Sequence, residues 1–488
     1  MLRRTLAAVV ALAGSAALAA PASAVVADHR AMTDLLTPTP ASYGAGYSPA
    51  VQQEDGYYPE HGDPRIDVLT YDLSLRWDPS SRKLTGTAKL HFRAVQTSPQ
   101  FQLDLAQPMA VSALQFSGGL NPTPPYTHDG KDLVVTPAAP IEAGQTYDVT
   151  VTYAGTPKPV GAPSSRVDMT GLGWHTAKDG QTWTMQEPYG AYTWYPVNDM
   201  PADKAIYSVS LDVPDPWVGI SNGTMSSRRD VAGRTLTTFK NTHPMASYLT
   251  TVAIGPYRKA TQTGPHDLPM TYWYPKGHPE MVDPLKTLPG AMTWLEHKLG
   301  PYPFERVGVV LTPSESAMET PTMITMGAKN FRYGNRDVRE TVVHELIHAW
   351  YGDTVTPTDW SDVWMNEGMA MYLEARYSVY KGWKPWQHWS REFNRNDGYW
   401  REIYGPPGAY KKREFAQINV YYCTARMLLR LRRIIGDTAF DAAVRDWPQA
   451  NKDKGRGRDA YVSWLENRTH KKLKAFFDTE LDDAKPTQ

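Results

Sequence analysis

The chain is poor in cysteine and has no excess of charge of either sign. Its 488 residues include one cysteine, Cys423, so no disulfide can form within the chain. No histidine lies near Cys423 in the sequence, so we expect a packed thiol and not a nucleophile. The 51 basic side chains balance the 51 acidic ones, which gives no electrostatic reason to expect nucleic acid or a membrane surface as a partner. The 41% apolar composition suits two or three globular domains stabilised by their cores.

The chain also lacks an apolar run of about 20 residues, the length that spans a membrane. Its most apolar stretch, Leu6 to Ala20, has fifteen residues, with two arginines before it and Ala22-Ser23-Ala24 after it. This arrangement is typical of a secretory signal peptide. We therefore expect residues 1–24 to be a signal peptide cut after Ala24, and the protein to be secreted without a membrane anchor. Residues 25–59, rich in Pro, Ala, Ser and Gly, are expected to form a flexible arm.

Alternation of apolar and polar residues begins near residue 65. Tyr71, Leu73, Leu75 and Trp77 alternate with polar residues, a turn follows at 78–81, and a second alternating run comes next. Similar runs continue to about residue 257. The pattern predicts an antiparallel β domain over residues 60–258 with one face buried.

Beyond this domain the apolar period becomes helical, and residues 259–488 are expected to form a mainly α domain. The predicted helices cover residues 285–299, 336–352, 361–380, 418–435 and 457–478.

The motif His344-Glu345-Leu346-Ile347-His348 lies on the second of these predicted helices. Two histidines four residues apart project from one face of a helix, so both imidazoles can bind one metal ion. The opposite face is apolar and is expected to be buried. The spacing predicts a zinc ion with Glu345 beside it as the general base of a hydrolytic reaction.

A third ligand is expected from the next predicted helix, where Glu367 follows the motif after eighteen intervening residues. Another class of zinc protease has Gly three and His six residues after the second histidine. Tyr351 and Thr354 occupy those positions here, so that class is excluded. The prediction is one Zn²⁺ per chain, held by two histidines and Glu367.

Two further roles need donors or acceptors near the metal. The developing oxyanion of a hydrolytic reaction needs a hydrogen-bond donor, and the helix at 418–435 offers Tyr421 or Tyr422. The chemistry alone does not choose between them. The zinc histidines need outer partners to fix their rings, and Asp362 is a candidate.

Four separated segments together resemble the aminopeptidase N family of zinc metallopeptidases. The resemblance covers residues 60–485. The segments are the zinc helix and its exit at 344–360, Trp364-Met365-Asn366-Glu367-Gly368-Met369-Ala370, Ser316-Ala317-Met318-Glu319-Thr320, and the stretch 186–201 that begins Gln186-Glu187-Pro188-Tyr189-Gly190. In fold, the resemblance implies an α+β chain of two domains. An N-terminal antiparallel β domain with a saddle-like sheet or sandwich precedes a mainly α, thermolysin-like catalytic domain.

The resemblance also implies roles for the substrate-binding residues. The backbone of Ser316, Ala317 and Met318 is expected to pair with an extended peptide, and Glu319 to bind its free α-amine. A second contact to the amine maps onto Glu187, with Gln186 as the alternative if the alignment shifts by one. For the oxyanion, the resemblance selects Tyr421 over Tyr422. Ser316 replaces Gly of the family signature and Thr320 replaces Asn, which leaves the charge unchanged.

The chain resembles a short form of the family without its long C-terminal helical domain, so a more open site is expected. The sequence thus predicts a secreted zinc aminopeptidase that removes N-terminal residues from peptides. One alternative is a zinc endopeptidase of the same family that does not require a free N-terminus. Another is a zinc-bound protein that binds but does not catalyse.

Overall fold

A computed structural model of the chain describes residues 53–118 and 121–485. The expected signal peptide and residues 25–52 of the expected arm lie outside this range. No helix within the described ranges is both long and apolar enough to cross a membrane.

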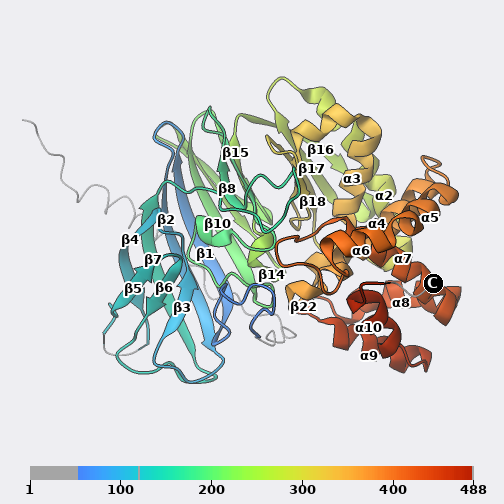
Figure 1. Cartoon of the computed structure of the whole chain (residues 1–488). Coiled ribbons are helices and arrows are strands. Elements are labelled where there is room, and N and C mark those ends of the chain that lie inside the picture. The colour runs from blue at the N-terminus through green and yellow to red at the C-terminus, as the bar shows by residue number, and fades with distance from the viewer. Residues whose placement is uncertain (1–52, 119–120, 486–488) are drawn as a thin grey trace, which may run out of the picture. The chain divides into compact units, whose positions relative to one another are not determined.

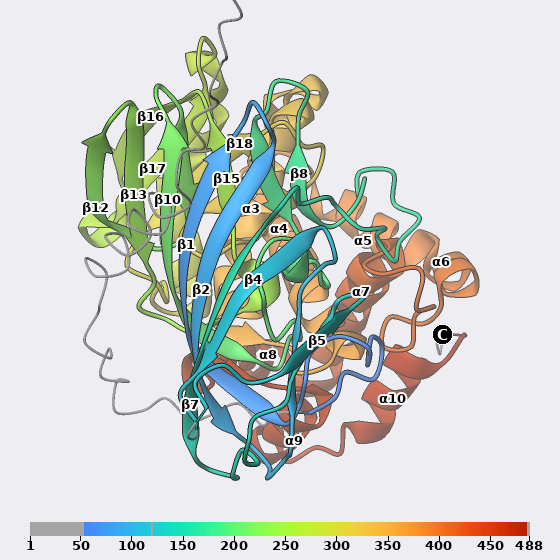
Figure 2. The same ribbon diagram turned by 90° about the vertical axis from the view of Figure 1, so that its left-hand side faces the viewer.

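The first half of the described chain is built of strands, and the second half is mainly helical (Figure 1). The largest sheet follows the order β12-β13-β10-β1-β2-β7-β4, with β14 paired to β10, and its broad face is seen in Figure 2. Its strands are β1 (Ile66–Asp78), β2 (Lys83–Ala94), β4 (Met109–Phe116), β7 (Thr146–Gly155), β10 (Lys204–Pro214), β12 (Thr224–Val231), β13 (Arg234–Lys240) and β14 (Met245–Ala246).

The predicted alternation at the start of this sheet is confirmed. Tyr71, Leu73, Leu75 and Trp77 of β1 are all buried, and the residues between them are more exposed. Strands β1 and β2 pair antiparallel, with Leu73 opposite Ala88. The period of two therefore reports a sheet with one face on the core.

The expectation of a purely antiparallel domain is wrong for one pair of strands, because β1 and β10 run parallel. Antiparallel neighbours can be joined by a short hairpin, but parallel neighbours need a long connection. Here that connection is the whole chain from Pro79 to Asp203, which includes one smaller sheet and two strands of another.

Two smaller sheets complete the first half of the chain, and one of them carries the segment after β9 that reaches toward the second half. One has the order β11-β15-β9-β8, and the other has the order β3-β6-β5. Gln186 and Glu187 follow directly after β9, so the end of this strand positions both. The strands are β3 (Phe101–Asp104), β5 (Tyr126–Asp129), β6 (Asp132–Val135), β8 (Gly173–Thr176), β9 (Thr182–Met185), β11 (Val218–Ser221) and β15 (Val252–Gly255).

A five-stranded sheet of order β16-β17-β18-β20-β19 opens the second half. Its strands are β16 (Tyr257–Thr263), β17 (Pro269–Pro275), β18 (Val307–Thr312), β19 (Ala317–Met318) and β20 (Ile324–Gly327). Strand β19 lies at the edge and pairs on one side with β20. Its other side is thus available for pairing with an extended peptide. A two-stranded parallel sheet joins β21 (Val355–Thr356) to β22 (Lys454–Gly455).

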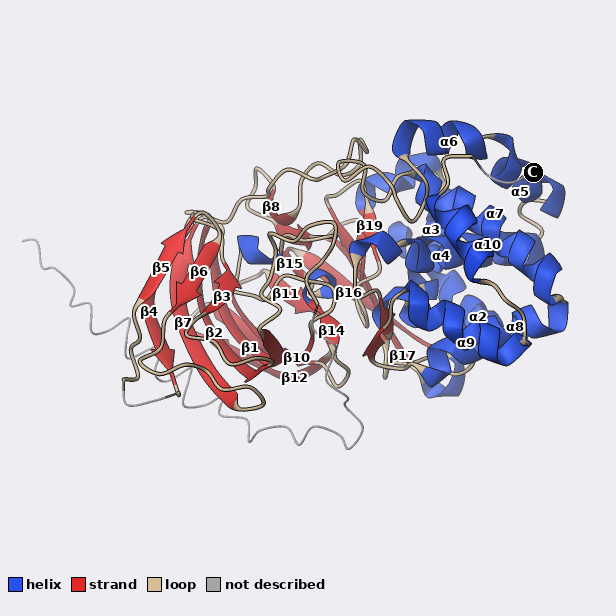
Figure 3. Cartoon of the chain, turned by 60° about the horizontal axis from the view of Figure 1, so that its bottom comes forward, coloured by secondary structure: helices blue, strands red, loops and turns tan. Residues whose placement is uncertain are grey.

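The helices gather on the side away from the large sheet (Figure 3). They are α2 (Leu288–Leu299), α3 (Asn335–Ile347), α4 (Trp364–Tyr380), α5 (Trp386–Arg395), α6 (Asp397–Tyr404), α7 (Ile418–Ile435), α8 (Asp437–Ala450), α9 (Arg458–Thr469) and α10 (Lys474–Asp482).

Most of the predicted helices are confirmed, and one is corrected. Helix α7 has the predicted bounds, and the apolar face of the zinc helix is buried as expected. The single helix expected over 457–478 is wrong, because His470 takes a left-handed conformation with φ 54° and ends α9. A left-handed residue breaks the helical hydrogen bonds, so α10 begins anew after it.

A glycine allows the close packing of α4 against α7. A Cβ atom on Gly368 would lie 2.1 Å from Cγ2 of Thr424. Such a distance is far inside van der Waals contact, so only glycine permits this approach. Gly368 is next to Glu367, and Thr424 is one turn beyond Tyr421, so the contact sets the spacing between two predicted site residues.

We therefore expect Gly368→Ala to lower the free energy of unfolding by about 1–3 kcal/mol, the usual cost of overpacking a core. The matched control is Gly290→Ala in α2, where a new Cβ would meet no atom within 4 Å. Removing a helical glycine there should stabilise the protein by up to about 1 kcal/mol. Thermal or denaturant unfolding measures both. Equal stability of the two variants would contradict the packing argument.

Candidate metal centre

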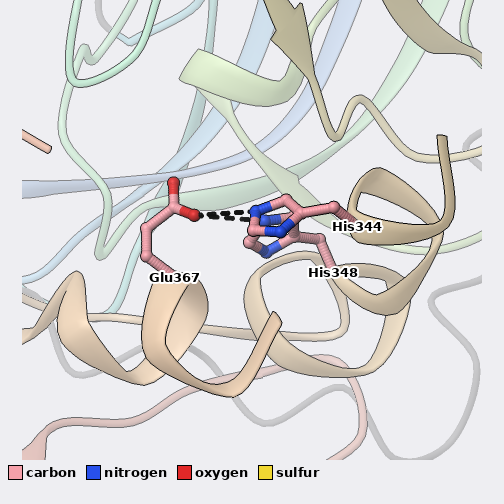
Figure 4. Close-up of side chains that lie close together, drawn as sticks. All are labelled: His344, His348 and Glu367. Carbon is pink, nitrogen blue, oxygen red and sulfur yellow. Dashed lines mark hydrogen bonds and ion pairs between the residues drawn. The ribbon is translucent and has the colours of Figure 1, made fainter. Parts of the chain in front are cut away.

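Two helices bring the three predicted metal ligands together. His344 lies in the last turn of α3, His348 caps that helix, and Glu367 lies in the first turn of α4. Oε2 of Glu367 is 3.1 Å from Nε2 of His344 and 3.4 Å from Nε2 of His348 (Figure 4). One ligand atom from each residue lies within 4.8 Å of the others, and all three residues are buried.

The remaining ring nitrogens are held by outer partners. Nδ1 of His344 lies 3.0 Å from Oε2 of Glu374, and Nδ1 of His348 lies 3.0 Å from the backbone oxygen of Tyr351. Both partners are acceptors, so each Nδ1 carries the hydrogen and each Nε2 keeps its lone pair for a metal.

These outer partners correct the expectation for Asp362. Its carboxylate accepts hydrogen bonds from Nε1 of Trp364 and from the backbone N–H of Arg458, so it braces the start of α4. Glu374 is the carboxylate that the sequence interpretation missed. It follows Glu367 by seven residues, or two helical turns, so it lies on the same face of α4. That spacing was the signal that would have found it.

The chain leaves α3 through a wide turn over Ala349–Asp353, which the bond from the Asp353 N–H to the His348 oxygen closes at 2.9 Å. Gly352 has φ 135°, a conformation that favours glycine. A Cβ atom on Gly352 would also lie 3.3 Å from Nδ1 of His348. The turn thus places the Tyr351 carbonyl against the histidine.

The three ligands fit zinc. Two imidazole nitrogens and one carboxylate oxygen are a donor set that catalytic zinc sites use. The histidine tautomers are fixed in the form that a metal needs, and the outer hydrogen bonds are in place.

Glu345 lies beside the metal ligands and is 8% exposed. Burial raises the pKa of its carboxyl to about 7, and the two histidines oppose this rise. A carboxylate with such a pKa can both accept and release a proton near neutral pH, which is what a general base and acid requires.

The metal ligands open into a cavity of about 610 Å³ that residues of both halves of the chain line. Glu187, from the β part, and Glu319, directly after β19, both face it. Each has a buried Oε1 atom that accepts no hydrogen bond within the described chain. Burial raises the pKa of both carboxyls, and for Glu187 the nearby Glu319 adds to the rise. Two unpartnered acceptors of this kind suit a cationic ligand.

Gln186 also lines the cavity, but its amide is used in packing. Its nitrogen donates to the backbone oxygens of Ser247 and Thr250, each at 2.9 Å, and its oxygen accepts from Nε1 of Trp194 at 2.8 Å. The geometry therefore favours Glu187 over Gln186 as the contact to a substrate.

Ser316, Ala317 and Met318 line the same cavity along the edge strand β19. The hydroxyl of Ser316 donates to Oδ2 of Asp168 at 3.1 Å. Thr320, which stands where the family signature has Asn, is buried and donates to the backbone oxygen of Met323. The Thr320 bond is therefore local, whereas the Ser316 bond links β19 to a loop of the β part.

Of the two tyrosines on α7, the structure brings Tyr421 to the cavity. The Tyr421 ring stacks 5.9 Å from the ring of His344, and its hydroxyl accepts a hydrogen bond from Nη1 of Arg166 at 2.9 Å. The Tyr422 ring packs against Phe393 at 5.6 Å.

Arg166 and Asp168 are cavity residues that the sequence interpretation missed. They lie on the loop between β7 and β8, where the sequence has no period and no motif. No local signal could have placed a loop of the β part beside the metal ligands.

Family models match both halves of the chain. The Peptidase M1 N-terminal domain matches residues 68–249, and the Peptidase family M1 domain matches residues 285–479.

Among curated proteins, aminopeptidase B of Mus musculus is 27% identical over 352 residues, which cover 64% of this chain and 50% of that protein. Leucine aminopeptidase 2 of Pyricularia oryzae is 25% identical over 309 residues, which cover 57% of this chain and 48% of that protein. The chain thus spans about half the length of the curated relatives it matches.

Among solved structures, the M1 zinc metallopeptidase from Deinococcus radiodurans superposes with a TM-score of 0.77 at 27% identity, covering 89% of this chain and 97% of that one. A mutant of that protein bound to a Tyr-Ser-Ala substrate gives a TM-score of 0.78 at 25% identity, and the match covers 89% of this chain and 98% of that one.

The role of Glu374 leads to a prediction about the metal. Glu374→Ala removes the acceptor of the His344 ring, so we expect zinc to bind about 10–100-fold more weakly, as is usual when such a partner is lost. Competition with a chelator measures the affinity. The control is Glu402→Ala, an exposed acid on α6. Unchanged zinc affinity in the Glu374 variant would show that it does not support the metal.

Proposed function

The chain belongs to peptidase family M1, the zinc metallopeptidase family that its motifs resemble, and from this we propose that it is an exported zinc aminopeptidase. It hydrolyses the N-terminal residue from peptides. One observation carries the proposal. Glu319 is buried and Glu187 is half-buried, and each has a buried Oε1 atom without a hydrogen-bond partner among the described residues, in the same cavity as the metal ligands.

These two carboxylates are the proposed site for the substrate α-ammonium. A single cation offers three N–H donors, and Glu187 and Glu319 offer charged acceptors in a buried setting, where such bonds are strong. Their place relative to His344, His348 and Glu367 fixes one distance from amine to scissile bond. An enzyme with this arrangement removes one residue from the N-terminus.

The chain's own groups supply the other steps. Zinc, when held by His344, His348 and Glu367, supplies a Lewis acid that activates water and polarises a carbonyl. Glu345 takes a proton from the attacking water and passes it to the leaving amine. Tyr421 donates a hydrogen bond from its hydroxyl to the oxygen anion that forms on the substrate carbonyl. The free side of β19 pairs with the backbone of the peptide.

A second candidate is an endopeptidase of the same family. The observation that favours it is the pair of substitutions in the exopeptidase signature, Ser316 for Gly and Thr320 for Asn. Glu319 is retained between them, which supports the aminopeptidase.

The role of Glu345 is tested by Glu345→Gln. This variant keeps the shape of the side chain but cannot accept a proton, so we expect kcat to fall by about 10²–10⁴-fold. Its zinc content, measured by atomic absorption, should equal that of the wild type. Glu402→Gln on the exposed face of α6 is the control and should keep full activity. Full activity in a zinc-loaded Glu345→Gln protein would exclude Glu345 as the base.

The role of Glu319 is tested with one peptide in two forms, with a free or an acetylated N-terminus. The wild type should cleave the free form, and a chelator should abolish cleavage. Glu319→Gln removes one charge from the ammonium site, so kcat/KM on the free form should fall about 10–100-fold.

Any residual cleavage of the acetylated form should not change in this variant, because that substrate has no ammonium. Wild-type cleavage of the acetylated form alone would establish the endopeptidase instead. If neither form is cleaved in a chelator-sensitive way, the protein binds zinc without catalysing peptide hydrolysis.

Export is tested by the N-terminus of the mature protein. When the chain from Met1 is expressed in an exporting host, the protein recovered from the medium should begin at Val25, because residues 1–24 have the pattern of a signal peptide. A chain that starts at residue 25 without this segment should stay in the cell. Recovery of the full chain only inside cells, with Met1-Leu2-Arg3 intact, would contradict export.

A further inference from the structure

Arg166 reaches the cavity from the β part of the chain. It lies on the loop between β7 and β8, and its side chain is 26% exposed. Its Nη1 donates to the hydroxyl of Tyr421 at 2.9 Å, and it lines the same cavity as the metal ligands. A guanidinium is therefore in direct contact with the proposed oxyanion donor.

The other nitrogens of Arg166 are held by partners that fix its position. Nε and Nη2 donate to the two carboxylate oxygens of Asp168 at 3.1 and 2.7 Å, a bidentate pair. Nη1 also donates to the backbone oxygen of Ala416 at 3.0 Å. Such a planar, doubly bonded pair defines the orientation of the guanidinium.

The loop itself is bonded to the residues just before α7. The backbone N–H of Phe415 donates to the oxygen of Pro163 at 2.8 Å, and the Ser164 hydroxyl donates to the oxygen of Phe415 at 2.8 Å. The Ser165 hydroxyl donates to Glu414 at 2.6 Å. The loop and the start of the helix that carries Tyr421 are thus held as one unit.

We propose that Arg166 is a positioning residue that orients the Tyr421 hydroxyl for catalysis, an inference that rests on the proposed peptidase function. A tyrosine hydroxyl has one hydrogen to donate and can accept in return. Because Arg166 has no acceptor, it must be the donor in their contact, and the hydrogen of Tyr421 is left to point elsewhere.

The remaining hydrogen of Tyr421 is available for donation into the cavity. Tyr421 lines that cavity together with His344, His348 and Glu367, and its ring lies 5.9 Å from the ring of His344. A positive charge behind the phenol oxygen also polarises the O–H bond and makes it a stronger donor. Arg166 acts through Tyr421 and does not need to touch the substrate.

Ser316 connects this network to the substrate-binding strand. Its hydroxyl donates to Asp168, the carboxylate that holds Arg166. A glycine at this position, as in the family signature, has no hydroxyl to donate. The substitution thus gives Asp168 a further donor and links the edge strand β19 to the oxyanion donor.

The main alternative is that Arg166 binds the C-terminal carboxylate of a short peptide. The structure favours positioning, because Asp168, Ala416 and Tyr421 already take donors from all three nitrogens of the guanidinium. The two roles predict different effects of losing Arg166 on the cleavage of a substrate without a carboxylate, such as an aminoacyl p-nitroanilide.

The test is a double-mutant cycle on such anilides with Arg166→Gln and Tyr421→Phe. Alone, Arg166→Gln should lower kcat about tenfold or more, the scale of a charge-assisted hydrogen bond, and leave KM within about twofold. In the Tyr421→Phe background it should have no further effect on kcat. Arg166→Lys keeps the charge without the bidentate fork, so its kcat should lie between that of Arg166→Gln and that of the wild type.

Two controls separate this role from a structural one. Arg76→Gln breaks an ion pair with Asp212 in the large sheet and should leave kcat unchanged. Zinc content and unfolding temperature of the Arg166 variants should match those of Arg76→Gln. A phosphonate transition-state analogue should bind Arg166→Gln more weakly in proportion to kcat/KM, while a free amino acid should bind as to wild type.

Equal kcat losses in the two backgrounds would overturn the proposal, because Arg166 would then act independently of Tyr421. So would a normal kcat on anilides combined with a raised KM for peptides alone, which would assign Arg166 to the carboxylate. If Arg166→Gln and Arg166→Lys both lose zinc or unfold early, the role is structural and the proposal fails. An inactive wild type would instead refute the proposed function.

Discussion

Carboxylates buried around one cavity are the constraint on which the rest of this structure depends. Glu319, Glu345 and Glu367 are at most 8% exposed. Glu187 adds a carboxylate with a buried oxygen, and Glu374 adds one that contacts the buried ring of His344. Arg166, the nearby guanidinium, is paired with Asp168. Isolated charges are costly in such surroundings unless cations neutralise them. A divalent metal at His344, His348 and Glu367, and an ammonium at Glu187 and Glu319, are the two cations that this arrangement calls for.

The fold brings these groups together from segments far apart in the sequence. Two helices supply the metal ligands, an edge strand supplies Glu319, the end of β9 supplies Glu187, and α7 supplies Tyr421. Close packing at Gly368 sets the spacing between α4 and α7, and the turn at Ala349–Asp353 holds the ring of His348. The β part therefore contributes to the site itself, since it supplies Glu187, one of the two proposed amine-binding carboxylates, and the loop whose Arg166 contacts Tyr421.

The sequence was informative where the chemistry is local. The spacing of His344, His348 and Glu367 follows from helical geometry, and alternation in the first strands reports one buried face. The parallel pairing of β1 with β10 was not predictable, because residues distant in sequence decide it. The same holds for Arg166 and Asp168, which reach the site from an irregular loop. Glu374 is predictable from helical geometry, since two turns of one helix separate it from Glu367, whereas no helical spacing places Asp362 beside the zinc histidines.

The central claim is that the cavity binds an α-ammonium at a fixed distance from the metal. The most direct measurement is a crystal structure of the zinc-loaded protein with a bound free amino acid, with anomalous scattering at the zinc edge. We expect zinc bound to His344, His348 and Glu367, and the ammonium nitrogen within hydrogen-bonding distance of both Glu187 and Glu319. An amino acid bound with its ammonium away from both carboxylates would contradict it.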